Sequence, residues 1–284
     1  MTTTIALAGK GGTGKTTIAA LLIRYLVEKR SGSILAIDAD PSSNLNMVLG
    51  MELEQTVGDI REGMLSLVQS SGALAGSMPG GVSKQEYLDY QIQMALVEDE
   101  RVDLLAMGRP EGPGCYCAAN QMLRVILDRI AANYDYVVMD NEAGMEHLSR
   151  RTTREVDVLL LVTDPTQRGL VAAQHMREMV PELEIGVGHV YLIVNRLRGE
   201  RAGSGKQEAG NGGVWECGSV GGGAGKLPLP LAETVAQTGL ELIGTVPEDP
   251  AMAEFEFAGR PLVELPADAT VYRAVQEIAK RVVG

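Results

Sequence analysis

A glycine-rich segment near the beginning of the chain has the residue types that bind a nucleoside phosphate. It comprises Gly9, Lys10, Gly11, Gly12, Thr13, Gly14, Lys15, Thr16 and Thr17. Glycines let successive backbone N–H groups turn inward to form a nest for an anion, and the first turn of a following helix adds partial positive charge. Lys15 is expected to reach the β- and γ-phosphates, and the Thr16 hydroxyl is expected to ligate Mg²⁺. The segment therefore predicts a P-loop that binds a nucleotide with Mg²⁺.

Carboxylates follow two further apolar runs. Asp38 and Asp40 come at the end of the run Ile34–Ile37, and Asp140 comes directly after another run. A carboxylate that faces a P-loop can orient an attacking water and support the ligand shell of Mg²⁺. We expect Asp140 to hold a magnesium-bound water, and the segment Glu142–Gly144 after it to sense the γ-phosphate.

A pair of cysteines offers a second kind of chemistry. Cys115 and Cys117 lie in the run Gly-Pro-Gly-Cys-Tyr-Cys, shortly after the apolar run Val102–Met107. Two thiolates at this spacing can bind one metal ion, but zinc and nickel sites commonly use four such donors. A two-fold dimer would bring two pairs together and complete a four-sulfur site. The flanking glycines and proline favour an exposed loop over a packed core for this pair.

Strand-length and helix-length segments alternate along the chain and would position these residues. Expected strands are 4–8, 34–37, 102–107, 136–139, 156–162, 190–194 and 240–246, and expected helices are 16–29, 121–132, 170–179 and 270–283. Alternation at this pitch implies right-handed βαβ units. We therefore predict one α/β P-loop NTPase domain over residues 1–284, with a mostly parallel sheet of about seven or eight strands flanked by helices. Ligands of such sheets lie at the carboxyl ends of the strands, where the P-loop and the carboxylates fall.

Two stretches depart from this alternation. Residues 55–97 have helical character and are expected to form an accessory helical region beside the sheet. Residues 199–225 are rich in glycine, serine and charged residues, which predicts a long insertion on the surface. For Cys217 within this insertion, we favour no role in metal binding over a role as a third ligand.

Composition and charge limit the class of protein. The formal net charge of −12 argues against binding nucleic acid or an anionic membrane through a broad basic surface. No run of about 18 apolar residues occurs, so no transmembrane helix is expected. The first apolar run leads straight into the P-loop, which leaves no room for a signal peptide, and three cysteines do not form a secreted disulfide framework. We expect a cytoplasmic protein.

Lys10 makes the P-loop resemble that of a known group. A second lysine, in the pattern Lys-Gly-Gly-x-Gly-Lys-Thr, resembles the deviant Walker A motif of the MinD, ParA, nitrogenase iron protein and arsenite-pump ATPases. The resemblance implies an ATPase in which ATP holds two subunits face to face and Lys10 reaches the partner's phosphates. It also implies that Asp40, the aspartate before the proline, orients the attacking water, with Asp38 as an outer-shell partner of Mg²⁺.

The same resemblance implies a base pocket. Asn195 follows the expected strand 190–194, and Pro247, Glu248 and Asp249 follow the expected strand 240–246. These positions match those at which the deviant Walker ATPases hold adenine. ATP is expected rather than GTP from this resemblance, and the guanine-binding pattern Asn-Lys-x-Asp does not occur in the sequence.

The cysteine pair and the segment 140–151 make the resemblance closer. Together with the P-loop, Cys115, Cys117 and the run Asp-Asn-Glu-Ala-Gly-Met-Glu-His-Leu-Ser-Arg-Arg look like the CooC family. Members of that family are nickel-insertion ATPases that mature carbon monoxide dehydrogenase, and a sibling family, AcsF, serves acetyl-CoA synthase. The resemblance covers nearly the whole chain except 199–225. It implies a homodimer with nickel, or zinc in vitro, at a thiolate site shared by two subunits, and one of those two enzymes as the client.

Two other functions stay open. A MinD- or ParA-like positioning ATPase would need a basic amphipathic C-terminal helix or a basic DNA-binding face, whereas the segment 270–284 is typical of a packing helix. An iron–sulfur ATPase like the nitrogenase iron protein draws a cluster cysteine from a loop soon after the Walker B aspartate, whose position here is that of Asp140, and residues 140–154 contain no cysteine. His147, His175 and His189 are left outside the metal site, because an isolated histidine is more often structural.

Overall fold

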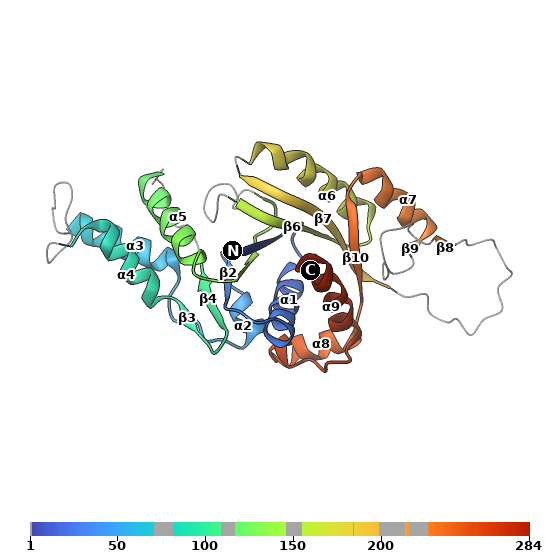
Figure 1. Cartoon of the computed structure of the whole chain (residues 1–284), viewed down its shortest axis with the longest axis horizontal. Helices are drawn as coiled ribbons and strands as arrows, with labels where there is room; N and C mark the ends of the chain where they lie inside the picture. The colour runs from blue at the N-terminus through green and yellow to red at the C-terminus, as the bar shows by residue number, and fades with distance from the viewer. Residues whose placement is uncertain are drawn as a thin grey trace.

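An eight-stranded sheet forms the centre of the molecule, with helices on both of its faces (Figure 1). The computed structural model describes residues 2–70, 82–108, 117–145, 155–183, 185–198, 214–215 and 227–284. The strands of the sheet are β1 (Thr3–Ala8), β2 (Ile34–Asp38), β3 (Val97–Glu98), β4 (Val102–Ala106), β5 (Tyr136–Asp140), β6 (Glu155–Thr163), β7 (Gly186–Leu197) and β10 (Glu241–Pro247). They lie in the order β10-β7-β6-β1-β5-β2-β4-β3, and every neighbouring pair is parallel except β3 with β4. The expected α/β fold with a mostly parallel sheet is confirmed.

Helices bury the apolar side chains of both sheet faces. The helices of the described residues are α1 (Lys15–Lys29), α2 (Leu45–Leu49), α3 (Val57–Ser70), α4 (Lys84–Met94), α5 (Cys117–Ala131), α6 (Gln167–Met179), α7 (Leu229–Thr238), α8 (Pro250–Phe257) and α9 (Thr270–Val282), with 3-10 turns η2 (Val180–Glu182) and η3 (Leu262–Glu264). Ile5 and Leu7 of β1 pack in one core with α1 and α9, whereas Ala6 and Ala8 pack in the other core with α3 to α7. Burial on both faces explains why the central strands are continuous apolar runs.

Smaller features complete the description. A short antiparallel ribbon joins β8 (Val214–Trp215) to β9 (Leu227–Pro228). Among the described residues, none of the helices combines the length and apolarity of a transmembrane span.

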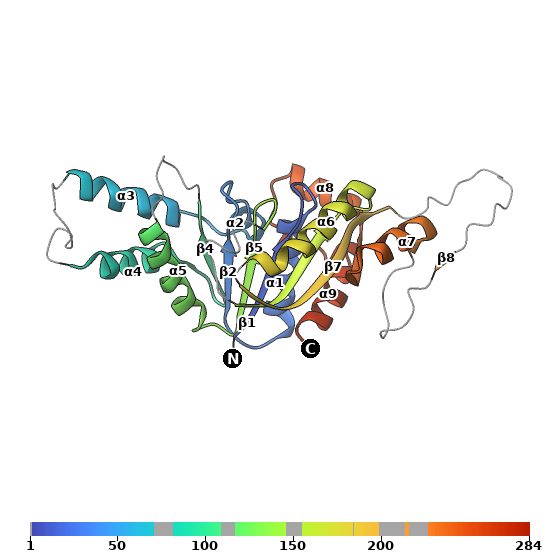
Figure 2. The ribbon, with the colours of Figure 1, turned by 90° about the horizontal axis from the view of Figure 1, so that it is seen from above.

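Helices α3 and α4 extend away from the sheet beyond β4 (Figure 2). Both fall within the stretch 55–97, for which the sequence predicts helices beside the sheet. Helix α4 begins with a capping box, in which Ser83 accepts the N–H of Glu86 at 3.2 Å and Glu86 accepts the N–H of Ser83 at 2.9 Å. Residues 71–81 lie outside the described residues, as does the expected insertion 199–225 apart from 214–215.

Several elements differ from those that the sequence predicts. Strand β7 spans Gly186–Leu197 rather than 190–194, because its first residues pair with β6 although they include glycines and are partly exposed. No apolar run marks such residues as a strand. The elements α2, β3, α7 and α8 were not predicted, since short segments carry too few turns or alternations for a periodic pattern.

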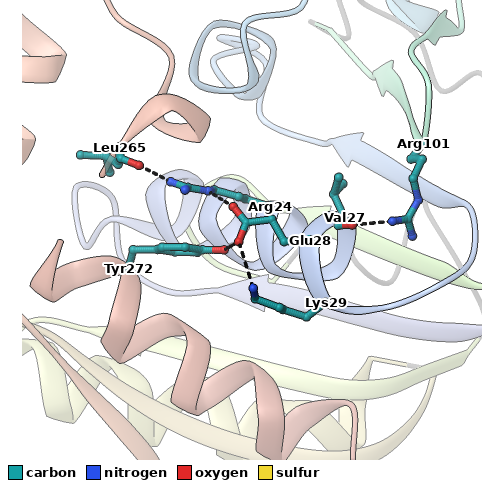
Figure 3. Close-up of polar contacts among 7 residues, drawn as sticks. All are labelled: Arg24, Val27, Glu28, Lys29, Arg101, Leu265 and Tyr272. Atoms are coloured by element: carbon teal, nitrogen blue, oxygen red, sulfur yellow. Dashed lines mark hydrogen bonds and ion pairs between the residues drawn. The ribbon is translucent and has the colours of Figure 1, made fainter. Parts of the chain in front are cut away.

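Polar contacts hold the C-terminal half of α1 (Figure 3). The guanidinium of Arg24 donates to the carboxylate of Glu28 at 2.6 Å and to the carbonyl oxygen of Leu265 at 2.6 Å. It also lies over the ring of Tyr272, 4.0 Å from the ring centroid, and the hydroxyl of Tyr272 donates to Glu28 at 2.8 Å. These contacts fasten α1 to α9 and to the segment before it.

Arg101 satisfies carbonyl groups at the C-terminus of α1. Its guanidinium donates to the carbonyl oxygen of Val27 (Figure 3). It also donates to the carbonyl oxygens of Arg30 at 2.5 Å and of Gly32 at 3.0 Å. The last carbonyls of a helix have no intrahelical partner, and a cation there also interacts favourably with the helix dipole. Arg101 therefore fixes the position of the helix whose other end forms the P-loop.

Candidate functional site

The P-loop connects the end of β1 to the start of α1, as the sequence predicts. Gly9 has a φ of +155°, and a Cβ added there would lie 2.2 Å from the carbonyl oxygen of Val162, so only glycine fits between β1 and β6. Gly14, with a φ of +90°, is the N-cap residue of α1, whose first residue is Lys15. The N-terminus of α1 therefore faces the loop, in the arrangement that binds phosphate.

Lys15 is folded back onto the P-loop. Lys15 is 7% exposed, and its Nζ donates to the carbonyl oxygens of Gly9 at 3.2 Å and Lys10 at 3.4 Å. Burial lowers the pKa of Lys15, and neighbouring carboxylates, that of Asp140 foremost, oppose this effect. Lys10 is exposed, and its contact with another subunit stays a prediction. The two lysines thus have different surroundings.

Asp38 holds the loop that follows β2. It is fully buried, its Oδ1 accepts the N–H of Asp40 at 3.1 Å and its Oδ2 accepts the N–H of Leu45 at 2.9 Å. Burial raises the pKa of Asp38 to about 6, although these hydrogen bonds lower it. Asp40 is half-buried, and its Oδ1 accepts the N–H of Ser42 at 2.8 Å as well as the Ser42 hydroxyl. Asp38 thereby positions the backbone that carries Asp40.

Asp140 lies beside Asp38 in the sheet, because β2 and β5 pair in register at these two residues. It is 1% exposed, the Thr16 hydroxyl donates to its carboxylate, and its Oδ1 has no hydrogen-bond partner among the described residues. Burial raises the pKa of Asp140 to about 7. A buried carboxylate oxygen without a partner, next to a threonine hydroxyl, fits Mg²⁺ and its bound water.

The segment after Asp140 is tied to β1 and the P-loop. Asn141 donates from Nδ2 to the carbonyl oxygen of Leu7 at 2.8 Å, and Gly144 donates its N–H to the carbonyl oxygen of Gly9 at 3.3 Å. Asn141 is 1% exposed, and its role in this link is not among those that the sequence predicts. The sequence feature that could have indicated this role is a polar residue directly after Asp140, the aspartate at the Walker B position. His147 lies outside the described residues.

Asn195 is placed differently from what the sequence predicts. It lies inside β7 rather than after it, is buried, and donates from Nδ2 to the carbonyl oxygen of Thr13 at 2.7 Å. A contact between Asn195 and adenine stays a prediction. In the structure, the side chain instead contacts the backbone of the P-loop.

The other residues predicted for the base pocket lie at the end of β10. Pro247 is its last residue, and Glu248 donates its N–H to the carbonyl oxygen of Leu197 at 3.0 Å. Asp249 caps α8 by accepting the N–H of Ala251 at 3.0 Å, and it also accepts the Thr270 hydroxyl at 2.7 Å. β10 and β7 are neighbouring parallel strands, so these residues and Asn195 lie together near the carboxyl ends of the two strands. Their roles toward adenine stay predictions.

The cysteine pair is only partly within the described residues. Cys115 lies outside them, as does Cys217, and Cys117 is the first residue of α5, although its side chain is not described. The preceding segment leaves the sheet at the nucleotide edge, which is the edge formed by the carboxyl ends of the strands, where the P-loop, Asp38 and Asp140 lie. Met107 marks this point, since it donates its N–H to the carbonyl oxygen of Asp38 at 2.7 Å. Elsewhere in the described part of the chain, no group of three or more His, Cys, Asp or Glu residues is arranged to hold a metal ion.

Comparisons with known proteins agree with this geometry. The model of the CobQ/CobB/MinD/ParA nucleotide binding domain matches residues 4–209. An uncharacterized ATP-binding protein of Methanocaldococcus jannaschii is 41% identical over 280 residues, which are 98% of each chain. The carbon monoxide dehydrogenase accessory protein CooC of Rhodospirillum rubrum is 31% identical over 203 residues, which are 68% of this chain and 74% of that protein.

A solved structure shows the same fold. The septum site-determining protein MinD of Pyrococcus horikoshii, complexed with Mg-ADP, has a TM-score of 0.62 and 21% identity, and the match covers 100% of this chain and 96% of that one. The family model covers most of this chain, including the P-loop and the carboxylates that face it. The chain belongs to the CobQ/CobB/MinD/ParA family of P-loop ATPases.

Proposed function

We propose that this chain is an ATP-hydrolysing metallochaperone for nickel. In this proposal two subunits close on ATP, bind nickel at a thiolate site that they share, and assist its insertion into carbon monoxide dehydrogenase or acetyl-CoA synthase. The observation that carries the proposal is where the described chain lies on either side of the C-x-C run: Met107 is hydrogen-bonded to Asp38 before it, and Cys117 begins α5. The similarity to CooC supports the choice of cargo and client.

The residues of the P-loop edge divide the ATPase chemistry among them. Backbone N–H groups and Lys15 bind and orient the phosphates, and Asp40 orients the attacking water. Thr16 would ligate Mg²⁺ directly and Asp140 through a bound water, and the ion when bound neutralises charge on the β- and γ-phosphates. Lys10 of each subunit balances charge on the nucleotide of the other, for which its exposure leaves it available.

The thiolate site couples this cycle to the cargo. One subunit contributes two sulfur donors, Cys115 and Cys117, and the two-fold axis of a dimer supplies the other two. Closing the dimer on ATP brings the pairs together, and hydrolysis separates them. Because thiols must lose a proton to bind metal, nickel affinity should rise with pH.

Metal content and subunit mass test the proposal together. Wild type, a Cys115→Ala/Cys117→Ala double variant and a Cys217→Ala control would each be incubated with Ni²⁺ or Zn²⁺, without nucleotide, with ADP or with ATP. We expect one metal ion per dimer for wild type and the control, and none for the double variant. Metal retained by the double variant, or full activation of carbon monoxide dehydrogenase by it, would overturn the thiolate site.

A positioning ATPase like MinD is the second candidate, favoured by the match of fold over the whole chain. The last helix argues against membrane binding through an apolar face, because Val271, Tyr272, Val275 and Ile278 of α9 are buried in the core with α1. Co-sedimentation with anionic vesicles and with DNA, in ATP, separates the candidates. Binding to either with no metal bound would favour positioning.

A further inference from the structure

Asn195 links two parts of the nucleotide edge that are far apart in the sequence. Its Nδ2 donates to the carbonyl oxygen of Thr13 at 2.7 Å, across a separation of 182 positions. Its Oδ1 accepts the N–H of Arg196 at 2.9 Å, and the residue is 5% exposed. Both ends of the amide are therefore engaged within the protein, and one of them is engaged with the P-loop.

The backbone around Asn195 holds the amide in this orientation. Arg196 has a φ of +57°, which is uncommon for a residue other than glycine. The pairing of β7 with β10 shifts register between Val194 and Leu197, where β7 has one extra residue. Such a bulge re-aims side chains away from the regular alternation of a strand. The bulge and the left-handed residue are the local features that direct the amide toward Thr13.

The P-loop is shaped to receive this amide. A Cβ added to Gly14 would lie 2.3 Å from Nδ2 of Asn195, so the glycine leaves the space that the amide occupies. Thr13 is 2% exposed, and its hydroxyl donates to the carbonyl oxygen of Lys10 at 2.9 Å. The anchored residue thus belongs to the inner, buried turn of the loop.

We propose that Asn195 is a positioning residue that holds the P-loop in its phosphate-binding conformation. A loop that is already ordered loses no binding free energy to being ordered by the ligand, so it binds phosphate more tightly. Without the amide, the buried carbonyl of Thr13 loses its partner, and the loop gains conformations in which its N–H groups no longer converge. The effect therefore falls on phosphate binding, whichever base is attached.

Two variants and a ligand without a base test this proposal. Asn195→Ala removes the amide, whereas Asn195→Asp keeps its shape but places an acceptor against the carbonyl of Thr13. Dissociation constants for Mg-ATP and for Mg-tripolyphosphate would be measured by competition against a fluorescent ATP analogue. We expect the dissociation constants of both ligands to rise by the same factor, about tenfold for Asn195→Ala and more for Asn195→Asp, because an unpaired buried carbonyl is costly. Hydrogen exchange of residues 9–17 should be faster in both variants without ligand.

Thr238→Val is the matched control. Thr238 is also buried, at the end of α7, and its hydroxyl makes two hydrogen bonds: it donates to the carbonyl oxygen of Val235 and accepts the N–H of Leu240. We expect this variant to lose stability with no change in either affinity. Weaker binding of ATP with unchanged binding of tripolyphosphate would instead show that Asn195 contacts the base, and would overturn the proposal. Unchanged affinities for both ligands, or an equal loss in the control, would overturn the proposal. Neither nickel nor hydrolysis enters these measurements.

Discussion

Gly144 donates its backbone N–H to the carbonyl oxygen of Gly9 at 3.3 Å, in an antiparallel bridge between the P-loop and the segment after Asp140. The same oxygen accepts Nζ of Lys15 at 3.2 Å. A phosphate that draws Lys15 to itself would leave Gly144 to bond this carbonyl without that competitor. The segment that is expected to sense the γ-phosphate is therefore tied to an atom that the nucleotide affects.

Gly9→Ala should destabilise the protein much more than Gly12→Ala. A Cβ at Gly9 would overlap the backbone of Val162, whereas none of the described atoms lies within 4 Å of a Cβ at Gly12. We expect Gly12→Ala to cost about 1 kcal/mol of unfolding free energy from its positive φ alone, and Gly9→Ala at least about 3 kcal/mol. Urea unfolding measures both. Equal losses would show that the strand can move away from Gly9.

Subunit mixing tests whether Lys10 acts on the partner's nucleotide. We expect Lys10→Ala and Asp40→Ala each to hydrolyse ATP poorly as pure dimers. In a mixed dimer, the Lys10→Ala subunit keeps its own Asp40 and receives Lys10 from its partner, so one site is intact. An equal mixture should recover roughly a quarter of wild-type activity by random pairing. If the mixture stays as inactive as either variant, Lys10 acts within its own subunit.

Asp140→Asn should raise the Mg²⁺ requirement. The substitution keeps the shape of the side chain but removes the charge that would hold a magnesium-bound water. We expect the Mg²⁺ concentration for half-maximal ATP hydrolysis to rise at least about tenfold, as for other groups that orient metal-bound ligands. Asp157→Asn is the control, because Asp157 lies on β6 and accepts the N–H of Thr4. An unchanged Mg²⁺ requirement in Asp140→Asn would remove Asp140 from the metal site.

Arg101→Ala should destabilise the fold through α1. The variant leaves the carbonyl oxygens of Val27, Arg30 and Gly32 without this donor, and we expect a loss of about 2 kcal/mol in urea unfolding. Arg101→Lys should lose about half as much, because an ammonium cannot reach three carbonyls as a planar fork does. Arg198→Ala, which removes an exposed ion pair with Glu248, should have no measurable effect. A loss in this control as large as that of Arg101→Ala would contradict the assignment.

Tyr272→Phe should change the response of stability to alkaline pH. Burial, aided by the nearby charge of Glu28, raises the pKa of Tyr272 to about 12. The phenol of the unfolded chain has a pKa of about 10. The contribution of Tyr272 to the free energy of unfolding is therefore complete below that pH and is lost as the pH rises to about 12. We expect Tyr272→Phe to lose about 1 kcal/mol at neutral pH with its hydrogen bond to Glu28, and to fall less steeply than wild type over that alkaline range. Parallel curves would contradict this.

Local patterns were sufficient to predict the P-loop, the carboxylates at the ends of β2 and β5, and the α/β fold. Each of these rests on residues that are close in the sequence: glycines around Lys15, or an aspartate after an apolar run. The same patterns failed for the first half of β7 and for short helices, where glycines or few turns leave no periodicity.

Contacts between distant segments could not be predicted in this way. In the sequence, Asn195 is only a polar residue after a predicted strand. Its hydrogen bond to Thr13 depends on the bulge in β7 and on the space that Gly14 leaves in the P-loop. Likewise, the partners of Arg101 depend on β4 starting beside the end of α1. Residue type and spacing therefore specify which groups can do chemistry, whereas strand order and the path of the backbone set which of them meet, because a hydrogen bond requires two atoms within about 3 Å.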